Sequence, residues 1–428
     1  MTEPAGAGSK VYGDLEVQIT GIGVTTAVGQ GKESFAEALF TGAHAFGVMK
    51  RAGRGLPAVG TAANLQGESP AFLGAEIGAL ALPAGMHAVS MRSLSLSAQV
   101  ALITVDEAWR EARLDDVDPR RIGLIVGGSN LQQRELTLTH AAYRHKVHFL
   151  RPTYGFAFLD SDLCGACSER FGIQGFTYTL GGASASGQLA IIQASEAVRS
   201  GAADVCIAVG ALMDLSYWEC QALRTLGAMG STRYFDNPEA ACRPFDRGRD
   251  GFIYGEACGA LVVERAESAS RRQVQPYARI LAGALGTDGN RNPDPSVTGE
   301  SRVIAAALER AQWAGHDVDY INPHGTGSPL GDDVEVQAIR ACGIEGARIN
   351  ATKSIVGHSL SASGAVEVAA TLLQMRHSRL HPTRNLVDPI ANDLPWVRGA
   401  AEHAVVRNAL CLSMGFGGLS SALCVQKC

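Results

Sequence analysis

The stretch TLGGASASGQLAIIQASEAVRSG, residues 179–201, decides the fold class of this chain. It opens on small residues and continues as a helical pattern in which Leu189, Ile192 and Ala197 share an apolar side and Gly201 supplies the helix end. The apolar run DVCIAVGA at 204–211 follows directly and predicts a buried strand. A glycine-rich turn, a helix and then a strand are the units from which α/β proteins are built.

The same alternation continues along the whole chain. Helical patterns separate many of the short apolar runs that predict strands, and the runs lie at 15–20, 122–128, 204–211, 257–264, 277–285, 318–325, 348–354, 410–417 and 420–426. A charged, serine-rich stretch at 264–276 is the best candidate boundary between a longer first part and a shorter second part. We therefore expect a layered α/β architecture with mixed or parallel sheets.

Composition argues against several classes of partner. A net charge of −5 and a pI near 6.1 give no electrostatic footprint for nucleic acid, and no run of like charges suggests a membrane surface. Residues 1–14 are predicted to be a disordered tail with no signal peptide, and no window is long enough to span a membrane. Ten cysteines, mostly alone in apolar stretches, indicate a reducing compartment, so we expect a cytoplasmic protein.

Three other patterns could indicate functional sites, but each has a simpler structural interpretation. Cys164 and Cys167 have CxxC spacing, but no second pair follows, and helix packing is the better interpretation than a metal or redox site. The glycine-rich stretch 21–31 lacks the spacing and the ending of phosphate-binding loops. The histidines of THAAYRHKVHFL lack carboxylate support and are interpreted as loop or interface residues; they are His140, His145 and His148.

Ser184 stands at or just before the start of the helix that follows TLGGA. Unpaired backbone N–H groups and the helix dipole favour developing negative charge there, although an N-cap serine with small neighbours is the simpler interpretation of the pattern alone. A serine-hydrolase nucleophile elbow needs GxSxG, and Ser186 occupies the position of the second glycine. Ser186 is interpreted as a packing residue.

Two histidines stand in a sequence context that the other histidines lack. His324 in NPHGTGSPLGDD and His358 in TKSIVGHSLSASGAVE are each predicted at the end of a strand, beside a glycine that allows close approach of backbone or substrate. Near the C-terminus, SMGFGGLSS at 413–421 predicts a glycine turn between two strands, whose N–H groups could complete an oxyanion hole.

Taken together, the chain resembles the β-ketoacyl synthases. The resemblance rests on five motifs in the order of that family: ITGIGVTTAVGQG, RPFDRGRDGFIYGEACGALVVE, PHGTGSPLGDDVE, ATKSIVGHSLSASGAVE and SMGFGGLSS. It implies the thiolase fold, in which two similar α/β halves form five layers, αβαβα. The halves would be 15–268, carrying Ser184, and 269–428, carrying His324 and His358, usually in a homodimer with the active site where the halves meet.

The resemblance also implies roles for single residues. His324 and His358 match the histidines that decarboxylate a malonyl group on an acyl carrier protein, and Lys353 and Glu367 match their supporting pair. Thr326, Ser328 and Phe416 match residues that contact the pantetheine arm, and the backbone amides of Ser184 and Met414 match the oxyanion hole. Met414 replaces the phenylalanine that usually gates the acyl pocket. No metal or cofactor of its own is implied, because the carrier's phosphopantetheine arm brings the substrate.

Ser184 falls where the family has its nucleophilic cysteine. A serine hydroxyl needs a dedicated base, and none is obvious nearby, so self-acylation should be crippled while decarboxylation keeps its histidines. The stretch Gly181–Gly187 resembles the serine-carrying decarboxylases of polyketide β-branching cassettes. There, malonyl on a dedicated carrier becomes acetyl, which an enzyme resembling hydroxymethylglutaryl synthase then adds to the growing chain.

Three rival hypotheses stay open at the level of sequence. One is acyl transfer through an O-acyl Ser184, and a second is an engineered serine that traps an ordinary condensing synthase. The third is a non-catalytic partner subunit resembling chain-length factors, against which the retained His324, His358 and Lys353 argue.

Overall fold

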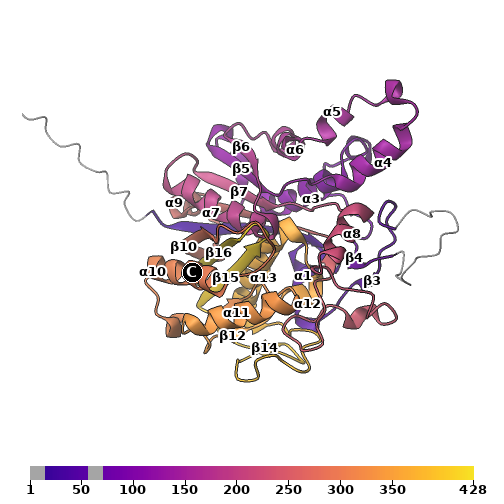
Figure 1. Cartoon of the computed structure of the whole chain (residues 1–428). Helices are drawn as coiled ribbons and strands as arrows, with labels where there is room; N and C mark the ends of the chain where they lie inside the picture. The colour runs from indigo at the N-terminus through magenta and orange to yellow at the C-terminus, as the bar shows by residue number, and fades with distance from the viewer. Residues whose placement is uncertain (1–14, 56–70) are drawn as a thin grey trace, which may run out of the picture.

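A computed structural model describes residues 15–55 and 71–428 of the chain. The tail predicted at 1–14 lies outside the described residues. Ten strands form one continuous hydrogen-bonded order, and its two five-stranded halves are the two β layers of the molecule (Figure 1). The first half contains β1 (Val17–Thr26), β5 (Ile122–Gly127), β6 (Thr177–Leu180), β7 (Val205–Gly210) and β9 (Ala257–Arg265). The second contains β10 (Ala278–Thr287), β11 (Tyr320–Asn322), β12 (Arg348–Ile349), β15 (Asn408–Gly415) and β16 (Leu419–Lys427).

The two halves repeat one topology. The first runs β6-β5-β7-β9-β1 and the second β12-β11-β15-β16-β10, and β1 pairs with β10 where they join. In each half the three strands at the outer end are parallel and the other two pairings are antiparallel. Even the bulges correspond, at Ile19–Gly21 in β1 and at Ile280–Ala282 in β10. The fold therefore contains a structural duplication.

Helices complete five layers. The central layer is α7 (Ser186–Arg199) and α13 (Ser363–His377), which contact each other and strands of both halves. The outer layers are α3 (Leu96–Glu111) with α6 (Ser161–Phe171), and α10 (Val297–Ala311) with α11 (Pro329–Ala341). The predicted thiolase-like αβαβα fold is confirmed. Its proposed division at residue 268 stays a prediction, and α9 (Ala266–Arg271) occupies the connecting stretch.

The two central helices begin with the same turn. Ala183-Ser184-Ala185-Ser186-Gly187 and Leu360-Ser361-Ala362-Ser363-Gly364 each form one turn of 3-10 helix and then enter the α-helix. The first residue of each has positive φ, +48° at Ala183 and +50° at Leu360. The helices cross at their glycines, since a Cβ on Gly364 would lie 2.5 Å from the backbone nitrogen of Gln188. Only glycine permits this approach.

Three local expectations differ from the structure. The pattern of α7 predicts an apolar side with Leu189, Ile192 and Ala197, yet Leu189 and Ala197 are only half-buried. The polar residues Ser186, Gln188 and Ser195 are buried instead. The strand predicted at 15–20 continues to Thr26 as β1, so Gly21 and Gly23 lie inside it. There α3 packs so closely that a Cβ on Gly23 would lie 1.8 Å from the carbonyl oxygen of Thr104. His358 does not follow a strand directly, because the short helix α12 (Lys353–Val356) intervenes.

Smaller elements surround this core. They are β2 (Gly29–Gln30), α1 (Lys32–Thr41), α2 (Ala88–Met91), α8 (Tyr217–Thr225), the pair β13 (Arg379–Leu380) and β14 (Glu402–His403), and a small sheet of β3 (Phe46–Val48), β4 (Leu73–Ala75) and β8 (Tyr254–Gly255). The helices α4 (Gln133–Tyr143) and α5 (Tyr154–Ala157) form an arm that extends away from the body (Figure 1). Across 15–55 and 71–428, no helix combines the length and apolarity that a membrane span requires.

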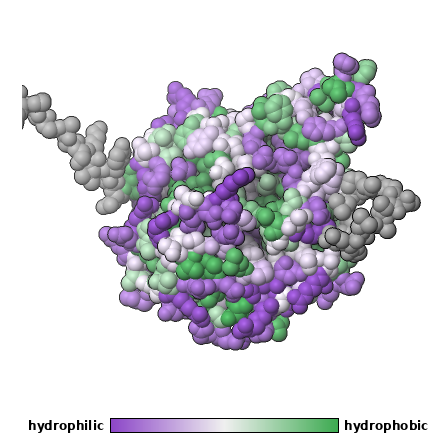
Figure 2. Space-filling model, in the orientation of Figure 1, coloured by the Kyte–Doolittle hydropathy of each residue, from purple (hydrophilic) through white to green (hydrophobic). Residues whose placement is uncertain are grey.

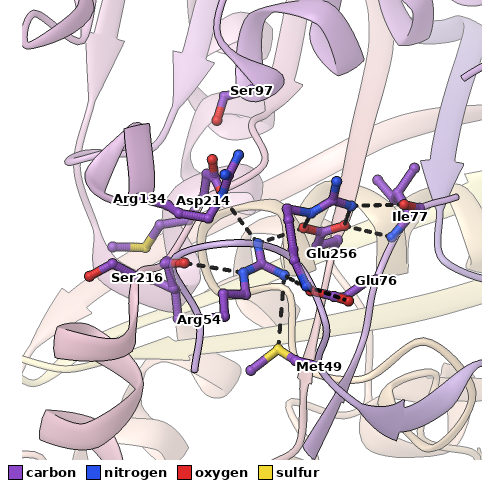
Figure 3. A network of polar contacts seen from close by, with 12 residues as sticks. Met49, Arg54, Glu76, Ile77, Ser97, Arg134, Asp214, Ser216 and Glu256 are labelled. Atoms are coloured by element: carbon purple, nitrogen blue, oxygen red, sulfur yellow. Dashed lines mark hydrogen bonds and ion pairs between the residues drawn. The ribbon is translucent and has the colours of Figure 1, made fainter. Parts of the chain in front are cut away.

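A buried ionic network supports one wall of the central cavity (Figure 3). Arg54 is fully buried and pairs with Glu76, Asp214 and Glu256, and its Nε donates to the carbonyl oxygen of Leu215 at 3.2 Å. A buried arginine stays charged, so its three carboxylates and the backbone oxygen must all keep their places. The network thereby fixes the residues around 213–215, which line the cavity described next.

Candidate active site

A cavity of about 640 Å³ opens where the two halves meet. Ser184 reaches it from the start of α7, His324 from the loop between β11 and α11, and His358 from the turn that leads into α13. On the surface, a hollow lies between α8 and the α10–α11 pair (Figure 2). The sequence-predicted residues Thr326, Ser328, Met414 and Phe416 line the same cavity.

Ser184 is presented by the strained turn before α7. The hydroxyl of Ser186 accepts the N–H of Gly182 at 2.9 Å and donates to the carbonyl oxygen of Ala183 at 2.7 Å. Ser186 therefore closes the turn with hydrogen bonds, which is more than the packing role predicted for it. The Oγ of Ser184, almost buried, lies 3.0 Å from Nε2 of His358.

The neighbours of His358 determine its tautomer. The backbone N–H of Leu360 donates to Nδ1 at 3.3 Å, and the hydroxyl of Ser363, which already accepts the N–H of Ser359, lies 2.9 Å from the same nitrogen. Because Nδ1 is an acceptor, the proton of the neutral ring resides on Nε2. Burial, reinforced by the charge of Lys353, holds the pKa of His358 well below its usual value. His358 is thus a neutral N–H donor toward Ser184 and the cavity.

His324 is held in the same way by a buried ion pair. The ammonium of Lys353 lies 3.4 Å from Nδ1 of His324, donates to its carbonyl oxygen at 2.5 Å and is paired with Glu367. An ammonium has no acceptor capacity, so Nδ1 accepts and Nε2 carries the proton. Burial, then Lys353, then His358 hold the pKa of His324 well below its usual value. The two imidazole rings stand at 85° to each other with centroids 5.5 Å apart.

Two glutamates complete the support of His324. Glu335 on α11 accepts the backbone N–H groups of His324 and Gly325 at 2.5 and 2.8 Å. Glu367 on α13 is buried, and one of its oxygens bonds Lys353. Burial raises the pKa of Glu335 to about 8 and that of Glu367 to about 7. The carboxyl groups position the lysine and the loop; they have no direct contact with Ser184 in the described residues.

The remaining predicted residues line the same cavity. The hydroxyl of Ser413 donates to the carbonyl oxygen of Ser184 at 3.3 Å, which ties the end of β15 to the turn before α7 and brings Met414 beside it. The backbone-amide roles of Ser184 and Met414 stay predictions. Ser328 caps α11 through the N–H of Gly331 at 3.1 Å, and Phe416 is the more exposed residue at the mouth.

Other sequence candidates lie elsewhere. Cys164 and Cys167 are buried in α6 among the apolar residues that pack on β5 and α3, as the packing interpretation predicted. His140 lies on the exposed arm, where Nε2 is 2.7 Å from the hydroxyl of Tyr154. Sequence reasoning missed Ser363 and Glu335. Both could have been sought, because Ser363 repeats Ser186 in the duplicated SASG turn and Glu335 stands on the helix that follows His324.

Comparisons with known proteins identify the family of this chain. The chain matches the models "Beta-ketoacyl synthase, N-terminal domain" over residues 14–269 and "Beta-ketoacyl synthase, C-terminal domain" over residues 277–387. It is 56% identical over 412 residues, 96% of each chain, to the polyketide biosynthesis malonyl-ACP decarboxylase PksF of Bacillus subtilis (strain 168). It is 32% identical to 3-oxoacyl-(acyl-carrier-protein) synthase 2 of Staphylococcus aureus (strain N315), covering 78% of this chain and 83% of that protein.

Solved structures show the same relationship. A β-ketoacyl synthase from Burkholderia phymatum STM815 superposes with a TM-score of 0.85 at 28% identity, covering 97% of this chain and 100% of that one. The ketosynthase complex AntDE:AntF, described as a type II PKS acyl-carrier protein with its ketosynthase bound to the hexaketide, gives 0.81 at 25% identity, covering 97% and 100%. With two like halves and a serine–histidine–histidine cavity between them, the chain belongs to the β-ketoacyl synthase family.

Proposed function

We propose that this protein decarboxylates a malonyl group carried by an acyl carrier protein and leaves an acetyl group on the carrier. One arrangement carries the proposal: Nδ1 of each cavity histidine faces an N–H donor, Lys353 for His324 and Leu360 for His358. Because burial also holds both pKa values well below the usual range, we assign the proton of each neutral ring to Nε2, which gives two N–H donors and no free imidazole base. The 56% identical Bacillus subtilis relative, named as a malonyl-ACP decarboxylase, supports the same assignment.

The tautomer of His358 explains why Ser184 is not a nucleophile here. In a serine–histidine pair that performs acyl transfer, the imidazole nitrogen facing the hydroxyl must be free to take its proton. Here that nitrogen already carries a proton, and its partner Nδ1 receives the N–H of Leu360. Ser184 therefore accepts a hydrogen bond from the imidazole instead of giving up its own proton. This geometry disfavours an enzyme that works through an O-acyl serine.

The same donors fit the chemistry of decarboxylation. When the bond between the malonyl methylene carbon and its carboxylate breaks, the electron pair moves toward the thioester oxygen, carbon dioxide leaves and an enolate forms. Two N–H groups on rings 5.5 Å apart can meet one oxygen between them. A donor aimed at a developing oxyanion in a buried site contributes about a hundred- to a thousandfold in rate. One proton on the methylene carbon then completes the acetyl group.

The cavity mouth suits a substrate on a long arm. Thr326, Ser328, Met414 and Phe416 line the approach to the histidines, and we assign them to the pantetheine arm of the carrier. The protein brings no cofactor of its own in this scheme. The AntDE:AntF structure, described as a carrier protein with its ketosynthase, supports a carrier as partner of this fold.

We propose that the protein forms a homodimer through the β6 edge of the sheet and the nearby exposed apolar residues. The strand β6 ends the sheet and contacts α6, which in turn contacts α5 of the arm. The apolar residues exposed between α4 and α6 are Val147, Phe149, Phe156, Phe158 and Leu159. Figure 2 shows apolar side chains on this arm. An unpaired strand edge beside exposed aromatic groups is suited to pairing with a second copy. Sedimentation of the purified protein tests this, and a monomer at micromolar concentration would contradict it.

The proposed pathway is polyketide β-branching in the cytoplasm, with an enzyme resembling hydroxymethylglutaryl synthase consuming the acetyl carrier. A trapped condensing synthase and a partner subunit would each behave differently from a decarboxylase. The trapped synthase would convert malonyl to acetyl only as a side reaction and would regain condensation with Ser184→Cys. A chain-length-factor-like subunit would leave malonyl intact.

Intact-protein mass spectrometry tests the function directly. The malonyl carrier protein, incubated with the purified enzyme, should lose about 44 Da, the mass of carbon dioxide, while the enzyme itself gains no mass. An acyl adduct on Ser184 or an unchanged malonyl carrier would refute the proposal.

A further inference from the structure

Glu300 is a buried carboxyl group that the scheme above does not use. It stands in the first turn of α10, it is only 3% exposed, and it lines the same cavity as Ser184, His324 and His358. Its Oε2 is buried and has no hydrogen-bond partner among the described residues. A buried polar atom without a partner costs free energy, so its retention in a cavity wall calls for an explanation.

The groups around Glu300 set its protonation state. Three acidic residues on neighbouring elements interact with Glu300: Asp288, Asp332 and Glu335. Asp288, just after β10, lies 3.9 Å from the guanidinium of Arg302, and Asp332 on α11 lies 3.7 Å from that of Arg249. Glu335 accepts the backbone N–H of His324. Burial and, next, the charge of Glu335 raise the pKa of Glu300 to about 9. At neutral pH, Glu300 is therefore a carboxylic acid with an unengaged O–H.

Decarboxylation needs a proton donor that the histidines do not supply. Their N–H groups are directed at the oxygen, and a ring whose pKa lies far below its usual value cannot give up a proton as imidazolium at neutral pH. Lys353 is paired with Glu367 behind His324. Glu335 and Asp332 accept backbone N–H groups. Glu300 remains as a proton donor: among the cavity-lining acids that the structure describes, it is the one that is buried and has an oxygen, Oε2, without a hydrogen-bond partner.

We propose that Glu300, in the wall of the same cavity, supplies the proton that turns the enolate into the acetyl group. The O–H bond of the carboxyl group breaks, a C–H bond forms at the methylene carbon, and the thioester carbonyl is restored. The Glu300 carboxylate then takes a proton from solvent through the cavity mouth. The sum is malonyl thioester plus one proton giving acetyl thioester plus carbon dioxide. This role rests on the proposed function.

The test compares Glu300→Gln, Glu300→Asp and the exposed control Glu309→Gln on the same helix, all with malonyl carrier protein. General acid catalysis typically contributes about a hundred- to ten-thousandfold, so we expect Glu300→Gln to lose at least a hundredfold in kcat with little change in KM. Wild type should lose activity as pH rises through about 9, and Glu300→Gln should lack that limb. Glu300→Asp should keep the limb, and Glu309→Gln should match wild type.

A second readout separates protonation from carbon dioxide release. With ¹³C-labelled bicarbonate and carbonic anhydrase present, an enolate that waits for a proton can recapture labelled carbon dioxide. Remaining malonyl carrier should therefore gain label with Glu300→Gln and not with wild type. A slower Glu300→Gln enzyme without label and with the alkaline limb retained would overturn the proposal, as would an unchanged rate. Failure of wild type to release carbon dioxide would count instead against the proposed function.

A stability measurement checks the protonated state without any turnover. The folded-state pKa of Glu300 lies above that of an ordinary glutamate, so its stabilising contribution is complete at low pH and is lost as pH rises toward about 9. Glu300→Gln has no such loss. Its melting temperature relative to wild type should rise steadily from about pH 6 to about pH 9, and a constant difference would overturn the assignment of a neutral acid.

Discussion

Substitutions of His358 test whether this residue acts in decarboxylation as a hydrogen-bond donor or as a base. Nε2 of His358 faces Ser184 Oγ at 3.0 Å, while Nδ1 accepts the N–H of Leu360. If the Nε2–H stabilises the enolate oxygen, His358→Ala should cost about 2.7–4 kcal/mol of transition-state stabilisation, a hundred- to a thousandfold in kcat. His358→Gln restores a neutral N–H donor of similar reach that cannot act as a base at neutral pH, so it should recover activity to within about tenfold of wild type.

Ser184→Ala is the companion variant. It removes the hydroxyl that now accepts from His358, which frees that N–H for the substrate oxygen. The rate should stay within about fivefold of wild type, because one neutral hydrogen bond contributes only about 1 kcal/mol. Ser361→Ala is the matched control, since Ser361 occupies the same place in the duplicated turn and donates to the carbonyl oxygen of Ala211 at 2.8 Å.

Single-turnover release of carbon dioxide from malonyl carrier protein is the appropriate assay. Both histidines have pKa values well below their usual range, so they stay neutral around pH 7 and the wild-type rate there should not vary with pH through them. If His358→Gln were as inactive as His358→Ala, or Ser184→Ala as inactive as either, the donor argument would be refuted and a base–nucleophile pair restored.

Two further predictions concern the scaffold of the site. Lys353→Met leaves the Glu367 carboxyl buried without its cation, which typically costs about 3–5 kcal/mol of folding stability. Adding Glu367→Leu should restore the melting temperature but not the activity. If the double variant recovered both, the pair would have no role in positioning His324. Gly364→Ala would place a Cβ 2.5 Å from the backbone nitrogen of Gln188 and should destabilise the protein by about 1–3 kcal/mol in a denaturant titration, whereas Gly346→Ala, with open space around it, should not.

The layered architecture and the two cavity histidines were accessible from sequence because both leave local signals. Apolar runs between glycine turns mark the strands of each half, and glycine-flanked His324 and His358 stand in long motifs. The environment of α7 was not accessible in the same way. In α7 the polar side chains of Ser186, Gln188 and Ser195 are buried. Leu189 and Ala197 are only half-buried, so residue types alone did not identify the buried side of this helix.

The tautomers and the role of Glu300 lie beyond sequence for a different reason. The N–H of Leu360 reaches Nδ1 of His358 only because of the positive φ of the turn, and the pKa of Glu300 depends on Glu335, which stands on a different helix. Contacts of this kind are created by packing between elements, and no pattern of residue types specifies them in advance.

The repeated turn at the two helix starts gives the molecule an internal comparison. Ser184 and Ser361 occupy equivalent backbone positions, yet the first faces an open cavity and the second bonds a strand carbonyl in the interior. The same backbone turn therefore presents one hydroxyl to the cavity and uses the other to hold a strand in the interior. The difference arises from what stands in front of each serine and not from the turn itself.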